Sequence, residues 1–246
     1  MQVRRRIALV SDIHGNAIAL RAVLRDIRRR GVDEVVCLGD VATLGVAPAE
    51  VIDLLQGLRC RCVMGNHDEY LLGRELIRAH CDVSEIIESI DWCRSQLGSD
   101  QLAFVSKFEA GFEIELSGAH RLRLFHGSPA SNTTNLLADT PAADLDRELG
   151  AAQASVMAGG HTHLQLLRSH RGAWLLNPGS VGAPFREFCG GCSPTILDHA
   201  EYATVGIRDG HLAVSLHKVA LDRSELRRAA SESALPMRAG LAAAYA

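Results

Sequence analysis

The chain has 246 residues, of which 47% are hydrophobic and 22% charged, a composition typical of a folded globular protein and not of a disordered one. Its formal net charge of −3 gives no overall basic field for binding long nucleic acids. No apolar run approaches the roughly 20 residues that span a bilayer, and the run near the N-terminus is too short for a signal-peptide core. We therefore expect a cytoplasmic protein with no membrane partner.

The first quarter of the chain alternates short apolar runs with segments of helical spacing. Each apolar run ends in a polar or acidic residue, and each helical segment ends near a glycine. Strands that alternate with helices in this way predict a parallel sheet. The expected strands are 5–12, 33–40 and 61–68, and the expected helices are 16–31 and 47–58.

The pattern changes twice beyond this region, although no linker divides the chain, so we expect one domain over 1–246. Residues 69–105 are helical in spacing and predict an inserted cap or flank, and 224–246 predict a surface helix with a frayed end. Between them the chain is β-rich, with antiparallel and buried strands broken by turn sequences. The expected elements are a hairpin over 111–127, a helix over 142–150, a strand over 154–160 and strand-like pieces over 164–219.

Polar side chains capable of holding metal ions follow the predicted strands. The carboxyl ends of parallel strands open into the crevice where ligands bind, so these side chains are placed there by the fold. Carboxylate, imidazole and amide groups suit Mn, Fe, Zn or Ni, and the lack of cysteine among them argues against a closed structural zinc site. The residues are Asp12, His14, Asp40, Asn66, His67, Asp68, His126, His161 and His163.

Two of these groups are pairs with a single residue between their members, Asp12 with His14 and His161 with His163. In an extended chain such side chains fall on the same side and converge on one ion. At a turn after a strand they can instead separate toward two adjacent ions. A lone histidine is more often structural, but five such groups at matching strand ends favour a metal centre.

The ordered set D-x-H, G-D, G-N-H-D, H and G-H-x-H resembles the calcineurin-like metallophosphoesterase superfamily. "SDIHGN", "GNHD", "GHTH" and "NPGS" together resemble its small bacterial phosphodiesterase branch, and the match runs from about residue 7 to about residue 180. The resemblance implies an α/β fold, a four-layer αββα sandwich of two mixed β-sheets flanked by helices with a helical insertion. It also implies a dinuclear metal centre at the strand ends.

The resemblance assigns a role to each of these residues. Asp40 bridges two ions, and His67 lies near the substrate phosphate, where it stabilises charge or protonates the leaving oxygen while Asp68 orients it. The two cofactor ions are divalent or mixed-valence Mn, Fe, Zn or Ni, with Mn the expected activating ion. The remaining ligands divide into Asp12, His14 and His163 on one ion and Asn66, His126 and His161 on the other.

We therefore expect a hydrolase of phosphoester bonds, a phosphodiesterase on a small or nucleotide-type substrate that uses metal-activated hydroxide at phosphorus. Asn66, His67 and Arg186 are expected at the substrate phosphate, although an inserted Phe185 departs from the Pro-Arg pattern of the branch. Two alternatives stay open. One is a non-catalytic metal-binding protein-interaction scaffold of the same fold, and the other is a DNA-end nuclease, which the acidic balance disfavours. The sequence identifies no oligomeric partner.

Three further polar residues are interpreted as lying outside the metal centre. Asn177 in "NPGS" is interpreted as a turn residue and not as a metal ligand, because Asn-Pro and Pro-Gly sequences begin turns. Cys189 and Cys192 in "CGGC" have the spacing of a zinc knuckle, but no second pair completes four ligands. We interpret these two cysteines as loop thiols.

Overall fold

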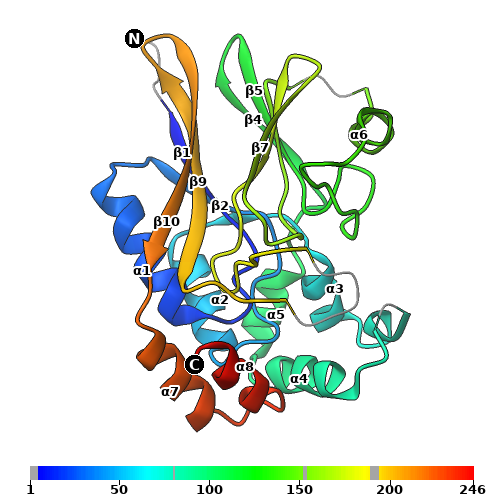
Figure 1. Cartoon of the computed structure of the whole chain (residues 1–246), viewed down its shortest axis with the longest axis vertical. Coiled ribbons are helices and arrows are strands. Elements are labelled where there is room, and N and C mark those ends of the chain that lie inside the picture. Colours follow the sequence, from blue (N-terminus) through cyan, green and yellow to red (C-terminus); the bar gives the residue numbers. More distant parts are fainter. Residues whose placement is uncertain (1–4, 80, 152–153, 189–193) are drawn as a thin grey trace.

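The first sheet is built from the alternating strands and helices of the N-terminal quarter, closed by a long C-terminal hairpin (Figure 1). The computed structural model describes residues 5–79, 81–151, 154–188 and 194–246. In the strand order β10-β9-β1-β2-β3, β1 to β3 are parallel, β9 pairs antiparallel with β1, and β10 pairs antiparallel with β9. The elements are β1 (Arg6–Val10), α1 (Ala17–Arg29), β2 (Glu34–Cys37), α2 (Pro48–Gly57), β3 (Arg61–Cys62), β9 (His199–Arg208) and β10 (His211–Ala220).

The second sheet has the order β4-β5-β6-β8-β7 and is also mixed. Its central strands β5, β6 and β8 are parallel, and the edge strands β4 and β7 pair antiparallel to their neighbours. The predicted hairpin over 111–127 is therefore confirmed as β4 and β5. The elements are β4 (Phe112–Ser117), β5 (His120–Leu124), α6 (Ala142–Leu149), β6 (Val156–Ala158), β7 (Leu166–His170) and β8 (Ala173–Asn177).

The two sheets face each other across an apolar core that holds Leu9 from the first sheet and Leu124 from the second. Outside the first sheet, α1 and α2 bury side chains such as Leu20 and Ile52. Outside the second sheet, Leu145 of α6 packs in a separate cluster. The predicted four-layer αββα arrangement is confirmed. The apolar run of β1 is buried on both faces of its strand, whereas the alternation along β4 buries one face.

The helical insertion consists of three α-helices and a short 3-10 helix. Part of its predicted apolar face is buried, at Ile90, Cys93 and Leu97, and Trp92 packs partly buried against the same core. No described helix is long and apolar enough to cross a membrane. The elements are α3 (Asn66–Leu72), η1 (Leu76–Ala79), α4 (Ser84–Ser95) and α5 (Ser99–Val105).

The C-terminal tail differs from its prediction. In place of one frayed surface helix, it forms α7 (Arg223–Glu232) and α8 (Arg238–Ala244), which pack on each other at the same end of the molecule as α4 (Figure 1). Pro236 separates them because proline cannot continue a helix and restricts the residue before it. Tyr245, directly after α8, is buried with Leu226 of α7. The tail is therefore a docked part of the fold.

Candidate metal centre

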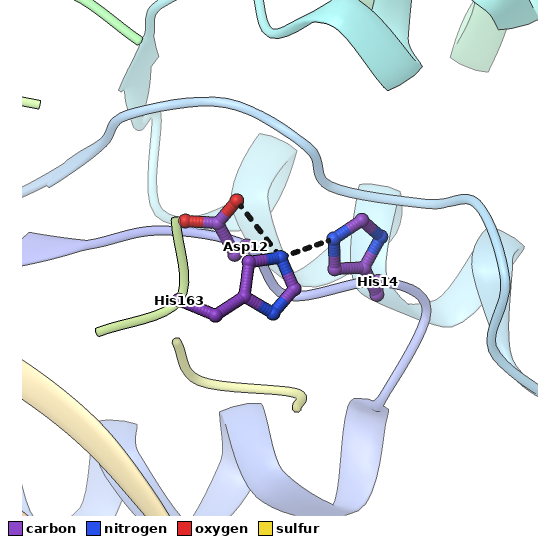
Figure 2. A group of neighbouring side chains, drawn as sticks. All are labelled: Asp12, His14 and His163. Carbon is purple, nitrogen blue, oxygen red and sulfur yellow. Dashed lines mark hydrogen bonds and ion pairs between the residues drawn. The ribbon is translucent and has the colours of Figure 1, made fainter. Parts of the chain in front are cut away.

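A first cluster of three predicted ligands lies where the two sheets meet. Asp12 and His14 follow β1 of the first sheet, and His163 follows β6 of the second (Figure 2). Nε2 of His163 lies 3.3 Å from Oδ1 of Asp12 and 3.0 Å from Nε2 of His14. All three side chains are buried, and their ligand atoms lie within 4.8 Å of one another. We call this group the first cluster.

A second cluster lies beside it and again draws on both sheets. Asp40 follows β2, His126 follows β5 and His161 follows β6, with ligand atoms within 4.8 Å of one another. Asn66, the first residue of α3, joins them because its Oδ1 lies 3.2 Å from Nε2 of His126. We call Asp40, Asn66, His126 and His161 the second cluster.

Asp40 lies between the two clusters. Its Oδ2 is 3.3 Å from Nε2 of His126 in the second cluster and 3.9 Å from Nε2 of His14 in the first. Its Oδ1 accepts a hydrogen bond of 2.9 Å from the backbone N–H of His67. The two histidines of "GHTH" fall in different clusters, His161 in the second and His163 in the first.

Five of these residues have a left-handed backbone conformation. Their φ angles are 53° at Asp12, 45° at His14, 57° at Asp40, 68° at His161 and 58° at His163. The extended geometry that would place the members of a pair on one side is therefore absent. Such positions in non-glycine residues cost about 1–3 kcal/mol each and persist only where the surrounding structure enforces them.

Two glycines let the turns of the site approach each other. A Cβ on Gly160 would lie 1.9 Å from Oγ of Ser11 and 2.6 Å from Oδ2 of Asp12. A Cβ on Gly65 would lie 2.1 Å from Oδ1 of Asp40. Neither position has room for any other residue. The glycines before "HTH" and before "NHD" are thus required by the close contact of backbone and carboxylate.

Hydrogen bonds at Nδ1 fix the orientation of two histidine rings. Nδ1 of His126 donates to the carbonyl of Leu38 at 2.6 Å, and Nδ1 of His163 donates to the carbonyl of Ala183 at 2.7 Å. Such a bond places the Nδ1 proton and directs Nε2 into the site, as in most metal-binding histidines. In His14, Nδ1 lies 3.4 Å from Oγ1 of Thr43.

Two carboxylates and two histidines of the site are in the form that binds a cation at neutral pH. Burial raises the pKa of Asp12, but His163 and His126 together outweigh it and lower the pKa to about 2. Burial acts in the same direction on Asp40, but His126 and its neighbours hold the pKa of Asp40 well below its usual value. Burial, together with neighbouring histidines, lowers the pKa of His14 to about 3 and that of His161 to about 4. At pH 7 the carboxylates are charged and these two rings are neutral, which is the form that binds metal.

The donor atoms fit a divalent transition-metal ion in each cluster. Oδ1 of Asp12 is buried and accepts no hydrogen bond from the described residues, although Nε2 of His163 is 3.3 Å away. Burial lowers the pKa of His163, but Asp12 and the carbonyl of Ala183 together raise it above its usual value, which favours a proton between His163 and the carboxylate. A cation at that point would replace the proton and engage the unpaired oxygen, and the N and O donors match Mn, Fe, Zn or Ni.

His67 lies at the edge of both clusters but in neither. Its ring packs edge-on against His14, with centroids 5.1 Å apart, and against Tyr70 at 5.2 Å. Nδ1 is buried without a hydrogen-bond partner among the described residues, and burial lowers the pKa of the ring.

Asp68 contacts the backbone of the ligand turns. Its Oδ2 accepts from the N–H groups of Asp40 and Gly65, and its Oδ1 accepts from that of Val41. Any influence of Asp68 on the His67 ring therefore passes through the turns that carry Asp40 and Asn66. Burial and Asp40 raise the pKa of Asp68 to about 7 despite these three donors.

The "NPGS" segment contributes more than the turn expected of it. Oδ1 of Asn177 accepts from Gly179 N–H, as a turn requires, while its Nδ2 donates to the carbonyl of Gly160 at 2.6 Å and lies 3.1 Å from Oγ1 of Thr162. Oγ of Ser180 donates to the carbonyl of Asp12 at 2.7 Å. These residues brace the ligand loops, a role that only the turn motif signalled in the sequence.

The predicted phosphate ligand Arg186 is exposed, and its backbone N–H donates to the carbonyl of Thr195 at 3.0 Å. The inserted Phe185 stacks on His163 of the first cluster. Cys189 and Cys192 lie outside the described residues.

Two facing mixed sheets with Asp, Asn and His side chains gathered at their strand ends are typical of metallophosphoesterases. A family model of the calcineurin-like phosphoesterase superfamily domain matches residues 6–202. The chain belongs to this superfamily, whose members bind divalent metals.

Three proteins illustrate what the chain is similar to. A metallophosphoesterase from Sphaerobacter thermophilus is 25% identical, with a TM-score of 0.75 over 99% of this chain and 100% of that one. An uncharacterized protein of Methanocaldococcus jannaschii is 29% identical over 81% of this chain and 85% of its own. A hypothetical protein from Pyrococcus horikoshii OT3 shares the fold, with 17% identity and a TM-score of 0.79 over 97% of this chain and 96% of that one.

Proposed function

We propose that this protein is a dinuclear metal-dependent hydrolase of phosphoester bonds, acting as a phosphodiesterase on a small or nucleotide-type substrate. The observation that carries the proposal is the pair of clusters that share Asp40, which has one carboxylate oxygen 3.3 Å from His126 and 3.9 Å from His14. A carboxylate between two buried groups of nitrogen and oxygen donors suits two adjacent cations better than one.

In this proposal the first cluster would hold one ion and the second cluster the other, with Asp40 shared. Bound there, two divalent cations would neutralise the phosphoryl oxygens and lower the pKa of a water molecule, so that it becomes a nucleophile at neutral pH. Mn is the expected activating ion among Mn, Fe, Zn and Ni. A phosphodiester is negatively charged and repels hydroxide, which is why charge neutralisation outweighs an isolated general base.

His67 is proposed as the group that assists the leaving oxygen. Its backbone N–H is fixed on Asp40, and its ring lies beside His14. A substrate phosphate beside the ring would favour its protonated form, which opposes the lowering of its pKa by burial. A protonated ring can donate to an alkoxide as the ester bond breaks.

Two further side chains are proposed at the substrate. The amide of Asn66 lies at the second cluster, where its N–H group can face a phosphoryl oxygen while its carbonyl faces the ion. Arg186 is exposed on the segment that passes the first cluster, and its guanidinium would neutralise charge on the part of the ester nearest solvent. A KM left unchanged in Arg186→Ala would exclude that contact.

The test is an assay of metal-stripped, Mn-reloaded protein on bis-p-nitrophenyl phosphate, p-nitrophenyl phosphate and cyclic nucleotides. We expect hydrolysis, with preference for diesters. His67→Ala should keep both ions but lose about 10²–10⁴-fold in turnover of cyclic nucleotides, whose leaving alkoxide needs a proton. The loss should be smaller with p-nitrophenyl esters, whose leaving group needs little help. The proposal would be refuted if none of these esters were hydrolysed, whether the stripped protein is reloaded with Mn, Fe, Zn or Ni.

A further inference from the structure

The aromatic ring of Phe185 lies flat on the imidazole of His163. The ring centroids are 4.2 Å apart, and the planes differ by 20°. Nδ1 of the same imidazole donates a hydrogen bond to the carbonyl of Ala183, two residues before Phe185. One short segment, 183–185, therefore contacts both the face and the outer edge of the ring, while Nε2 points toward Asp12 and His14 (Figure 2).

This segment is fixed on both sides. Toward the site, the N–H of Phe185 donates to the carbonyl of His163 at 3.2 Å, and the N–H of Ala183 donates to Oγ of Ser180 at 2.8 Å. Away from the site, Phe185 forms an antiparallel bridge with Ile196, and the N–H of Leu197 donates to the carbonyl of Pro184 at 2.8 Å. These contacts hold the backbone at Phe185, and so fix the point from which its ring reaches His163.

His163 needs such support more than an ordinary histidine. Its φ of 58° is a conformation that the chain holds only under constraint, and the torsion that turns an imidazole is soft. A hydrogen bond at Nδ1 alone fixes one point of the ring and leaves its plane to vary. In the second cluster, His126 has the corresponding bond to Leu38, and its described ring contact is edge-on, to His161 at 5.3 Å. Stacking thus distinguishes the two clusters.

We propose that Phe185 is a positioning residue that holds the His163 imidazole in the plane that directs Nε2 into the first cluster, and so strengthens cation binding at that cluster alone. This inference rests on the proposed function, because it takes the first cluster to be a metal site. Residues behind metal ligands change metal affinity by about 10–100-fold when removed. Loss of a stack leaves the Nδ1 bond in place, so we expect the lower end of that range.

The experiment titrates metal-stripped protein with Mn²⁺ in competition with a chelator, which yields two dissociation constants, and counts bound metal after dialysis. Phe185→Ala should weaken one of the two ions about tenfold. Phe185→Tyr, which keeps the flat ring, should bind both ions as the wild type does, and Phe185→Leu should resemble Phe185→Ala. Phe188→Ala is the matched control, because that ring is 42% exposed three residues along the same segment.

The outcomes separate a positioning role from general stability and from failure of the proposed function. Unchanged binding in Phe185→Ala, equal weakening of both ions, or full binding in Phe185→Leu would overturn the inference. Unfolding of the metal-free variants by urea shows whether Phe185→Ala still folds. If it does not, the comparison of Phe185→Tyr with Phe185→Leu decides whether the flat ring positions His163. A wild type that binds two ions but hydrolyses no ester refutes the proposed function and leaves the comparison between variants intact.

Discussion

The two clusters contain similar side chains but are supported in different ways. All three residues of the first cluster have left-handed backbone, and the carbonyl of Asp12 is held by Ser180 from far along the chain. In the second cluster, His126 and Asn66 do not have left-handed backbone, and Asn66 begins α3. The second cluster is thus built partly on regular elements, whereas the first depends on distant segments that enforce a strained backbone. Loss of the Ser180 hydrogen bond should therefore weaken the first cluster more than the second.

The largest effect is expected from Asp40→Asn. The substitution removes the negative charge between the clusters, so both ions should bind more than about 100-fold more weakly, beyond the range for residues behind the ligands. The bound metal after dialysis, counted by mass spectrometry, measures the change. Asp139→Asn, at an exposed position, is the matched control and should retain two ions. One tightly bound ion in Asp40→Asn would show that the carboxylate serves a single cluster.

A smaller effect, on one ion each, is expected from the histidines of "GHTH". His163→Ala should release the ion of the first cluster and retain the other, and His161→Ala should do the reverse, because their nitrogens lie in different clusters. Titration with Mn²⁺ of each variant, and of the double variant with Asp12→Ala, assigns the lost site. Exposed His211→Ala is the control. If both variants lose both ions equally, the clusters do not act as separate sites.

The smallest effect is expected from the bracing residues. Asn177→Ala should weaken both ions, because Asn177 holds the loop that carries His161 and His163, whereas Ser180→Ala should weaken the first cluster alone. We expect changes of about tenfold. Loss of the buried hydrogen bonds should also lower the free energy of unfolding of metal-free Asn177→Ala by about 1–3 kcal/mol, measured in urea. Selective weakening of the first cluster by Asn177→Ala would contradict this division.

Much of the fold could be predicted because strand ends and helix ends are marked locally. The run before Asp12 and the glycine before Asn66 identified the strand ends that carry ligands, and alternation identified β4 and β5. The tail was predicted wrongly, because its docking depends on contacts such as that of Tyr245 with Leu226, which the local pattern does not contain. Pro236 was the available signal that the tail is two helices.

Within the candidate site, residue types could be predicted but their support could not. Asp, Asn and His at strand ends are visible in the sequence, whereas the left-handed φ at His161 and His163 is found with hydrogen bonds to residues far along the chain. The stacking partner of His163 was visible only as an inserted Phe185, with no indication of what the ring touches. Spacing arguments that assume extended backbone fail at such turns, since left-handed residues redirect their side chains.

The sequence separation within the first cluster has a consequence for synthesis of the protein. His14 and His163 are 149 positions apart, and Ser180, which holds Asp12, is 168 positions away from it. During translation the N-terminal residues emerge long before their partners, and domains fold as units once the required chain is available. Asp12 and His14 therefore leave the ribosome as an incomplete ligand set, and a nascent chain can offer the complete cluster only after β6 and the "NPGS" turn have been made.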